Sequence, residues 1–280
     1  MWCWTRISSV KWEDSWAERL RFLGQGRVVF MEWPNGRTLK IEAYTEESIA
    51  KKLVAEFGGK AGPAHDWLSN PAPALKPASV RGRLRIYSDP GTFSSRPPTN
   101  SKYPRDLLIP AGMAFGTGDH ATTMTCLRML CDKSKGWPPG WSALDAGCGT
   151  GILGIAASVL GATKVDAFDF DPLAVRAAKE NVKLNPGCKM SVKPVDIHEW
   201  TPPRQYDVVL ANLFSDLLIG SASKLAAAAA DGGTVILSGI LRTQFPEVKF
   251  AMHTAGLSFD QITFVGKWTA AICVKRSAKS

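Results

Sequence analysis

A glycine-rich turn that follows an apolar strand constrains this chain more than any other feature. Residues 143–151 read Ala-Leu-Asp-Ala-Gly-Cys-Gly-Thr-Gly and connect a predicted strand, 142–146, to a predicted helix, 152–160. Glycine adopts positive φ angles and lets other atoms approach the backbone closely. In a doubly wound α/β sheet, such a turn at the carboxyl end of the first strand is a place where cofactors bind.

The rest of this region alternates between strands and helices. Further strands are predicted at 164–168, 191–196, 207–210 and 234–238, and further helices at 172–184, 217–230 and 244–255. This alternation predicts a parallel sheet with helices on both faces. Two β-rich runs, 258–265 and 267–275, then predict a closing antiparallel hairpin. Dehydrogenases with a doubly wound sheet do not typically carry such a hairpin.

The amino-terminal part predicts a separate, small domain. Residues 1–60 suggest a strand (1–7), a helix (11–23), two strands (27–33 and 38–44) and a second helix (45–57), which indicates a two-layer α+β domain. Residues 61–104 are rich in proline and glycine and predict a linker that contains one short strand, 83–87. Residues 105–280 then form the predicted doubly wound α/β domain, and a chain of 280 residues has room for both domains.

Composition narrows the compartment and the partners. The sequence has no apolar run of ~18 residues and no secretory signal pattern, so we expect neither a membrane span nor export. The six cysteines form no CxxC pair, so we expect no metal site and no disulfide framework. This cysteine pattern fits a protein of the reducing cytoplasm. The formal charge of +9 fits either a solvated basic surface or a partner in or near nucleic acid, such as the ribosome or its RNA.

Electrostatics select the cofactor. Gly149, Gly151 and Gly154 have the spacing of a dinucleotide-binding turn. However, Asp145 places a carboxylate at the end of the strand, where it would repel a pyrophosphate and attract a cationic ligand. S-adenosylmethionine carries an ammonium and a sulfonium and has no phosphate. The turn, including Gly147 and Gly149, therefore predicts S-adenosylmethionine rather than NAD.

Three aspartates follow predicted strands of the same sheet. Asp169 ends the second strand, near the ~20-residue offset at which a carboxylate binds ribose hydroxyls. Asp171 precedes Pro172 and predicts a helix cap. Asp196 follows the third strand, where contact with an adenine and a solvated loop are both open interpretations.

Two further polar sites lie near the predicted cofactor. Asn212 ends the fourth strand, where its carbonyl oxygen would accept a hydrogen bond from a substrate amine, and Phe214 would wall the site. Upstream, residues 110–123 form a glycine-dense loop followed by a polar cluster. In this cluster Thr122 or Thr123 would cap a helix and present a hydroxyl to the cofactor. His120 is either a general base or a structural residue.

Several motifs together resemble those of the bacterial ribosomal protein L11 methyltransferases. They are, in chain order, Ala114-Phe115-Gly116-Thr117-Gly118-x-His120-x-Thr122-Thr123, Leu144-Asp145-x-Gly147-x-Gly149-x-Gly151, Asp169-x-Asp171-Pro172, Ala211-Asn212-Leu213 and Leu237-Ser238-Gly239-Ile240-Leu241. The glycine turn marks only the broad methyltransferase class, whereas the Phe-Gly-Thr-Gly-x-His-x-Thr-Thr stretch is far more specific. The resemblance covers roughly residues 105–275.

The resemblance implies a domain organisation, an activity and a set of contacts. It implies a small substrate-recognition domain, a linker and a catalytic domain that methylates lysine side chains and the N-terminal amine of ribosomal protein L11. By motif position, it implies cofactor contacts at Thr123, Gly147, Asp169 and Asn212. One departure stands out: residues 212–215 are Asn-Leu-Phe-Ser, whereas the family usually has Asn-Ile-Leu-Ala.

The sequence therefore predicts a protein N-methyltransferase in which Asn212 and the backbone near Leu213 orient the amine and residues 112–118 close over the cofactor. Rival interpretations are a methyltransferase of another protein, of RNA or of a small molecule, a nicotinamide dehydrogenase, and a non-catalytic cofactor-binding or ribosome-binding module. An RNA methyltransferase predicts a basic stripe with stacking aromatic residues near the site.

Overall fold

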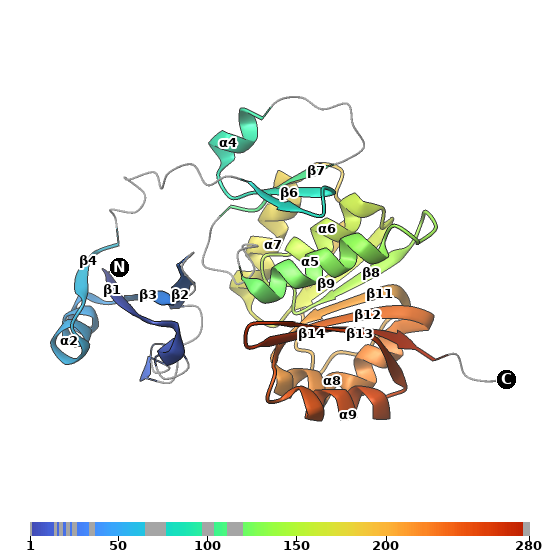
Figure 1. Cartoon of the computed structure of the whole chain (residues 1–280). Helices are drawn as coiled ribbons and strands as arrows, with labels where there is room; N and C mark the ends of the chain where they lie inside the picture. Colours follow the sequence, from blue (N-terminus) through green and yellow to red (C-terminus); the bar gives the residue numbers. More distant parts are fainter. Residues whose placement is uncertain are drawn as a thin grey trace. The chain divides into compact units, whose positions relative to one another are not determined.

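The computed structural model describes residues 2–13, 16, 19, 20, 23, 27–33, 37–64, 77–96, 104–110 and 120–276. The chain divides into two compact units, Met1–Ala74 and Leu75–Ser280 (Figure 1). In the described part of the chain, no helix is long and apolar enough to span a membrane. All six cysteines are free thiols.

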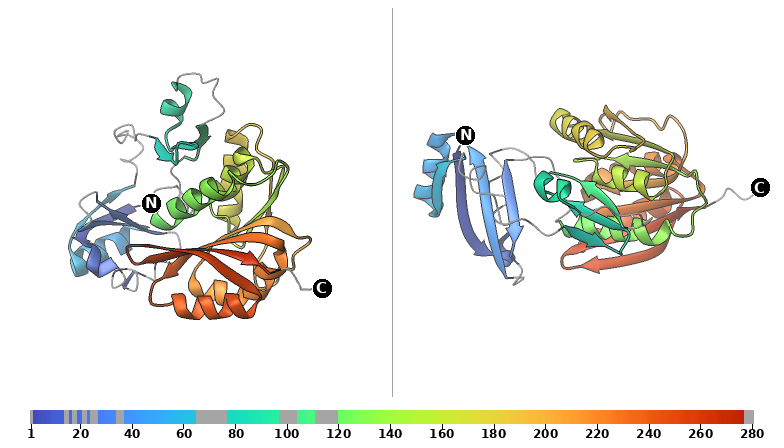
Figure 2. Two further views of the ribbon diagram at one scale, coloured as in Figure 1. Left: turned by 45° about the vertical axis from the view of Figure 1, so that its right-hand side comes forward. Right: turned by 90° about the horizontal axis from the view of Figure 1, so that it is seen from above.

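The amino-terminal unit is a four-stranded antiparallel sheet with a helix on one face (Figure 2). Its elements are β1 (Trp2–Ser9), the 3₁₀ helix η1 (Val10–Trp12), β2 (Val28–Glu32), β3 (Thr38–Thr45), α2 (Glu47–Phe57) and β4 (Lys60–Pro63), in the sheet order β2-β3-β1-β4. Trp4, Ile41 and Leu53 are buried between the sheet and α2. The alternating pattern of β3 explains this layer, because every second residue from Leu39 to Thr45 is buried.

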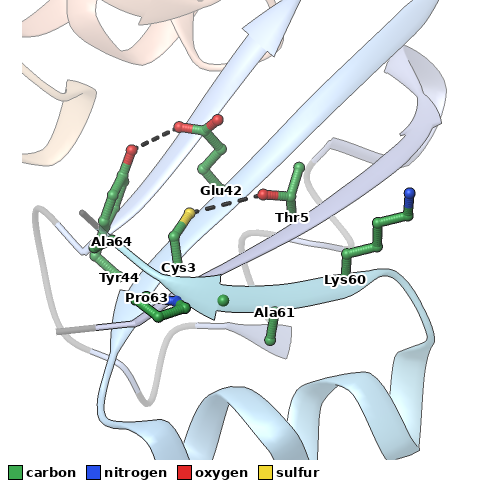
Figure 3. Close-up of a pocket in the computed structure, with 9 residues that line it drawn as sticks. Cys3, Thr5, Glu42, Tyr44, Lys60, Ala61, Pro63 and Ala64 are labelled. Carbon is green, nitrogen blue, oxygen red and sulfur yellow. Dashed lines mark hydrogen bonds between the residues drawn. The ribbon is translucent and has the colours of Figure 1, made fainter. Parts of the chain in front are cut away.

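Two features of this unit differ from the sequence expectation or go beyond it. Strand β4 pairs with β1 but lies just past the predicted limit at residue 60, because its residues Lys-Ala-Gly-Pro carry little strand pattern. The opposite sheet face has a hollow of about 320 Å³ lined by Cys3, Glu42 and Tyr44 (Figure 3). There the Tyr44 hydroxyl donates to Glu42 Oε2 at 2.7 Å.

Much of the predicted helix 11–23 lies outside the described residues.

A small three-stranded sheet precedes the large one within the second unit. It contains β5 (Ala78–Val80), β6 (Leu84–Tyr87) and β7 (Arg105–Leu108), and α4 (Pro90–Ser94) follows β6. Asn185, which ends α7 (Pro172–Leu184), attaches this sheet to that helix, since its amide accepts from the Leu108 N–H at 2.9 Å and donates to the Leu108 carbonyl at 2.8 Å. The predicted strand at 83–87 is confirmed as β6.

The large sheet has seven strands in the order β10-β9-β8-β11-β12-β14-β13. Its strands are β8 (Ser142–Ala146), β9 (Lys164–Asp169), β10 (Met190–Pro194), β11 (Tyr206–Asn212), β12 (Ala229–Leu241), β13 (Leu257–Val265) and β14 (Trp268–Lys275). The first five are parallel, and β13 and β14 form the antiparallel hairpin that the sequence predicts, with β14 paired to β12. The predicted fold class is thus confirmed.

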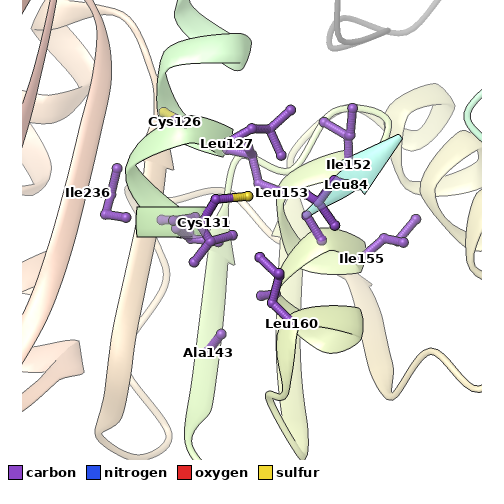
Figure 4. Packing of buried hydrophobic residues seen from close by; sticks show 14 of the residues in the cluster. Leu84, Cys126, Leu127, Cys131, Ala143, Ile152, Leu153, Ile155, Leu160 and Ile236 are labelled. Carbon is purple, nitrogen blue, oxygen red and sulfur yellow. The ribbon is translucent and has the colours of Figure 1, made fainter. Parts of the chain in front are cut away.

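Helices cover both faces of this sheet (Figures 1 and 2). They are α5 (Ala121–Lys133), α6 (Ile152–Leu160), α7 (Pro172–Leu184), α8 (Ser215–Ala228) and α9 (Phe245–Thr254). Leu127 of α5 and Ile155 of α6 pack in one core (Figure 4), whereas Leu218 of α8 and Val248 of α9 pack in the other. Residues 208–211 of β11 are completely buried, as expected of a parallel strand covered on both sides.

Candidate active site

Polar residues gather at the carboxyl edge of three adjacent strands. Strand β8 pairs in parallel with β9 on one side and with β11 on the other. The sequence ends β9 with Asp169 and β11 with Asn212, while β8 runs into the glycine turn. Because parallel strands end at the same edge, the predicted site residues come together there. Gly147 and Gly149 both have positive φ, at 68° and 53°, as the turn requires.

Asp169 is hydrogen-bonded to the turn. Its Oδ2 accepts from the Gly149 N–H at 2.9 Å, and its Oδ1 accepts from the Asp171 N–H at 3.0 Å. The residue is only 8% exposed. A carboxylate has about four acceptor sites, so two lone pairs remain for a ligand after both backbone contacts are made. The structure therefore presents Asp169 as a fixed acceptor at the edge of the sheet.

Asp145 has a different environment from the one that the electrostatic argument gave it. Its carboxylate is 1% exposed and turns inward, where Oδ2 accepts from the Gly154 N–H at 2.8 Å. Burial, together with a smaller contribution from the nearby Asp169 charge, raises the pKa of Asp145 to about 7. The side chain thus holds the first turn of α6 in place and is not an open surface charge.

Leu213 explains why two glycines are needed near the site. A Cβ on Gly147 would lie 2.3 Å from Leu213 Cδ2, and a Cβ on Gly239 would lie 2.5 Å from the Leu213 carbonyl oxygen. The Leu213 N–H also donates to the Ser238 carbonyl at 3.1 Å. The atom closest to Gly147 thus belongs to the Leu213 side chain, just after β11. From the sequence, only a ligand was expected at this position.

Asn212 contacts the start of α5. Its Nδ2 donates to Thr123 Oγ1 at 3.3 Å, which joins two residues that the sequence singled out separately. Its Oδ1 is buried and has no hydrogen-bond partner among the described residues. A buried acceptor without a partner is costly, and a ligand donor would remove that cost. Thr123 itself is 1% exposed.

The cap of α5 corrects one sequence prediction. Neither Thr122 nor Thr123 caps the helix, because helical backbone already begins at Ala121 and both threonines lie inside its first turn. The cap is His120, whose Nδ1 accepts from the Thr122 N–H at 3.4 Å. The His120 ring packs edge-on against Trp268 with centroids 5.3 Å apart, and burial lowers the pKa of His120.

Of the other candidates, Asp171 caps a helix, whereas Asp196 and Phe214 are exposed to solvent. Asp171 caps α7 by accepting from the Leu173 N–H at 2.9 Å, as predicted. Asp196 is exposed and accepts from the His198 N–H at 2.8 Å. Phe214 is 65% exposed just after Asn212. The predicted lid, 112–118, lies outside the described residues.

Two residues of the sequence motifs have contacts at this edge that the sequence did not predict. Ser238 is the register partner of Asn212 across β11 and β12 and is completely buried. Its signal is a polar residue that follows the apolar run Val235–Leu237. Leu213 follows Asn212 in the same motif, and the sequence marked this position without predicting the packing of its side chain. Both residues shape the wall beside the Asn212 amide.

The fold and the site define the class of protein. A doubly wound sheet with a terminal antiparallel hairpin, a glycine turn and carboxylates near the carboxyl ends of its first two strands is that of an S-adenosylmethionine-dependent methyltransferase. The family model described as ribosomal protein L11 methyltransferase matches residues 28–276. The chain belongs to the ribosomal protein L11 methyltransferase family.

Individual relatives agree with this assignment. The chain is 33% identical to the ribosomal protein L11 methyltransferase of Thiobacillus denitrificans, over 87% of this chain and 81% of that protein. It is 33% identical to the protein of the same name from Chromobacterium violaceum, over 95% of this chain and 89% of that protein. The crystal structure of the ribosomal protein L11 methylase from Lactobacillus delbrueckii subsp. bulgaricus has a similar fold, with a TM-score of 0.63 and 24% identity. The match covers 72% of this chain and all of that one.

Proposed function

We propose that this protein binds S-adenosylmethionine at the carboxyl edge of β8, β9 and β11 and transfers its methyl group to amines of ribosomal protein L11. The observation that carries the proposal is the buried Asn212 Oδ1, an acceptor without a partner among the described residues. It lies at the end of β11, beside the glycine turn that follows β8. This oxygen can accept a hydrogen bond from the N–H of a substrate amine.

The residues at this edge fit the cofactor. Asp169 keeps two acceptor sites for the ribose hydroxyls after its bonds to Gly149 and Asp171. Gly147 and Gly149 have positive φ angles and no side chain, so a ligand can approach the backbone of the turn closely. Asp169 adds negative charge where the ligand carries an ammonium and a sulfonium. Thr123, Gly147, Gly149, Asp169 and Asn212 are the residues that we propose to contact the cofactor.

When bound, S-adenosylmethionine supplies an electrophilic methyl group, and the chain's own residues position the acceptor. Asn212 Oδ1 accepts one N–H of the neutral amine and so directs the nitrogen lone pair. Thr123 fixes the amide through its contact with Nδ2 at 3.3 Å, which sets which atom faces the substrate. Burial of the entering amine lowers its pKa and favours the neutral form. In this mechanism no side chain acts as a dedicated base, and the proton that the amine loses goes to water.

The target belongs to the proposal and comes from the relatives. They are named for ribosomal protein L11, and the chain matches them over most of their length. We further propose that the amino-terminal domain recognises this substrate, that 61–104 is the linker and 105–280 the catalytic domain, and that the protein acts in the cytoplasm near ribosome assembly. The hollow on the sheet face opposite α2 is a candidate surface for such recognition (Figure 3).

Label transfer tests this function. The protein is incubated with methyl-labelled S-adenosylmethionine and, in parallel, with ribosomal proteins and with ribosomal RNA that lack the modification. We expect label in one small ribosomal protein and none in RNA. Label in RNA alone would show that RNA is the substrate and would leave the cofactor assignment unchanged. Binding of NAD instead of S-adenosylmethionine would overturn both.

A further inference from the structure

A second cleft opens at the end of the large sheet where the parallel strands begin, opposite the end that carries the glycine turn. It encloses about 400 Å³, which is within the usual range for small-molecule sites. Trp141, which directly precedes β8, lines it, and so does Gly161, which ends α6. The cofactor turn lies at the other end of β8, on the order of 15 Å away by the rise of a five-residue strand. The cleft is therefore separate from the proposed active site.

The charge of this cleft is of one sign. Among the described residues that line it, Arg83, Arg105 and Lys135 are cationic and none carries a carboxylate. Arg83 has a structural task, because its Nη1 donates to the Cys131 carbonyl at the end of α5 and to Ser134 Oγ at 2.7 Å. Arg105 and Lys135 have exposed side chains at the cleft. A cleft with this lining favours an anionic ligand.

Lys135 has only a weak competing partner. Its Nζ lies 3.3 Å from Asp132 Oδ1, and both side chains are largely exposed, at 59% and 42%. Exposed ion pairs contribute little to stability. Asp132 also contacts Arg81 at 2.9 Å, so its charge is shared between two cations. Lys135 is therefore only weakly held by its carboxylate partner.

An aromatic platform lies beside these cations. Trp137 is half-buried, and its ring contacts the buried Trp141 edge-on with centroids 4.8 Å apart. That contact fixes the orientation of the Trp137 ring while part of it stays exposed. Cations next to a fixed aromatic ring are the combination with which proteins hold single-stranded nucleic acid, because phosphates meet the charges and bases stack on the ring.

We propose that this cleft binds a nucleotide unit of single-stranded RNA, with the base stacked on Trp137 and the phosphate held by Arg105 and Lys135. The net charge of +9 favours a polyanion over a free nucleotide. Because the cleft lies at the edge opposite Asn212, RNA bound there is not methylated. It would hold the enzyme close to RNA while the amine of a protein enters the active site.

Binding of a labelled single-stranded RNA oligonucleotide, followed by fluorescence anisotropy at fixed salt, tests this site. The Arg105→Ala/Lys135→Ala double variant removes two phosphate contacts, so we expect at least a tenfold loss of affinity and a salt dependence shallower by about 1.4 in log–log slope. The Lys52→Ala/Lys249→Ala double variant is the control, because it removes the same charge from exposed positions on α2 and α9. Its affinity should stay within about twofold of wild type.

The aromatic contact is tested separately. Trp137→Leu keeps an apolar side chain but removes stacking, and we expect it to lose about tenfold in RNA affinity. Equal losses in the cleft and control double variants would show general charge attraction and overturn the site. Displacement of the oligonucleotide by a mononucleotide at similar concentration would reassign the cleft to a free nucleotide. The Arg105/Lys135 variant should keep wild-type methyl transfer to protein, which separates this site from the active site.

Discussion

The Asp169 carboxylate and the Gly149 N–H are joined by a hydrogen bond of 2.9 Å across twenty residues of sequence. This bond links the end of β9 to the glycine turn that follows β8. It makes the position of the ribose-binding candidate depend on the conformation of the turn. Changes at the turn, at Asp169 and at Asn212 therefore have separable consequences.

Replacing Asp169 with Ala should weaken S-adenosylmethionine binding by at least tenfold. The substitution removes the remaining acceptor sites for the ribose and the negative charge near the cationic ligand, and hydrogen bonds to charged groups contribute about 1.5–3 kcal/mol. Isothermal titration calorimetry measures the affinity. Asp171→Ala is the control, because it removes a helix cap at a cost of about 1 kcal/mol in unfolding free energy but should keep the affinity. Unchanged affinity in Asp169→Ala would remove this residue from the cofactor site.

Replacing Gly147 with Ala should cost more stability than the same change at Gly187. Both glycines have positive φ, 68° and 84°, so both variants acquire backbone strain of about 1 kcal/mol. Only at Gly147 would the new Cβ meet another side chain, Leu213 Cδ2, at 2.3 Å, whereas Gly187 has open space. Thermal unfolding of the two variants measures the difference. A second substitution, Leu213→Ala, should restore part of the loss in Gly147→Ala, and equal losses at the two glycines would contradict the packing argument.

Replacing Asn212 with Ala should lower kcat by more than tenfold while the affinity for S-adenosylhomocysteine changes less. The reason is that Oδ1 orients the amine for transfer, and loss of orientation acts on the reaction step. Steady-state kinetics with the protein substrate, together with calorimetry, separate the two effects. Thr125→Ala serves as the control on α5, where its hydroxyl bonds the Ala121 carbonyl at 2.7 Å. A variant with wild-type kcat would show that Asn212 does not position the amine.

Asp145 should give the folded protein a pH dependence that Asp145→Asn lacks. Burial raises the pKa of Asp145 from 3.8 to about 7, so the folded protein retains a proton that the unfolded chain releases. The unfolding free energy contributed by this group is therefore highest below about pH 4, falls by about 1.4 kcal/mol per pH unit up to about pH 7, and is constant above. The difference in unfolding free energy between wild type and Asp145→Asn, followed from pH 4 to 8, measures it. A difference that does not change with pH would show an ordinary Asp145 pKa.

The large sheet and its site edge were predictable because their signals are local. An apolar strand, a glycine turn and a capped helix succeed one another along the sequence, and parallel strands then bring Asp169 and Asn212 to one edge. The antiparallel hairpin was visible from two β-rich runs that meet at Gly266. Strand β4 was missed because its four residues gain their strand conformation from pairing with β1.

Other features depend on contacts that no local pattern encodes. The inward turn of Asp145 depends on the position of the Gly154 N–H, nine residues later in the chain. The cap of α5 is a histidine, which is not among the preferred capping residues, whereas threonine is, so the sequence favoured the neighbouring threonines. The need for glycine at 147 comes from Leu213, which approaches only when β8 and β11 pair.

Intact-mass spectrometry of ribosomal protein L11 tests the central claim most directly. Unmodified L11 is incubated with S-adenosylmethionine and either wild-type protein or Asn212→Ala, and modified residues are then located by peptide fragmentation. We predict that wild-type protein adds whole methyl increments at lysine side chains or the N-terminal amine, and that the variant adds them more slowly. An unchanged L11 mass with fully folded, cofactor-binding enzyme would contradict the assignment of L11 as the substrate.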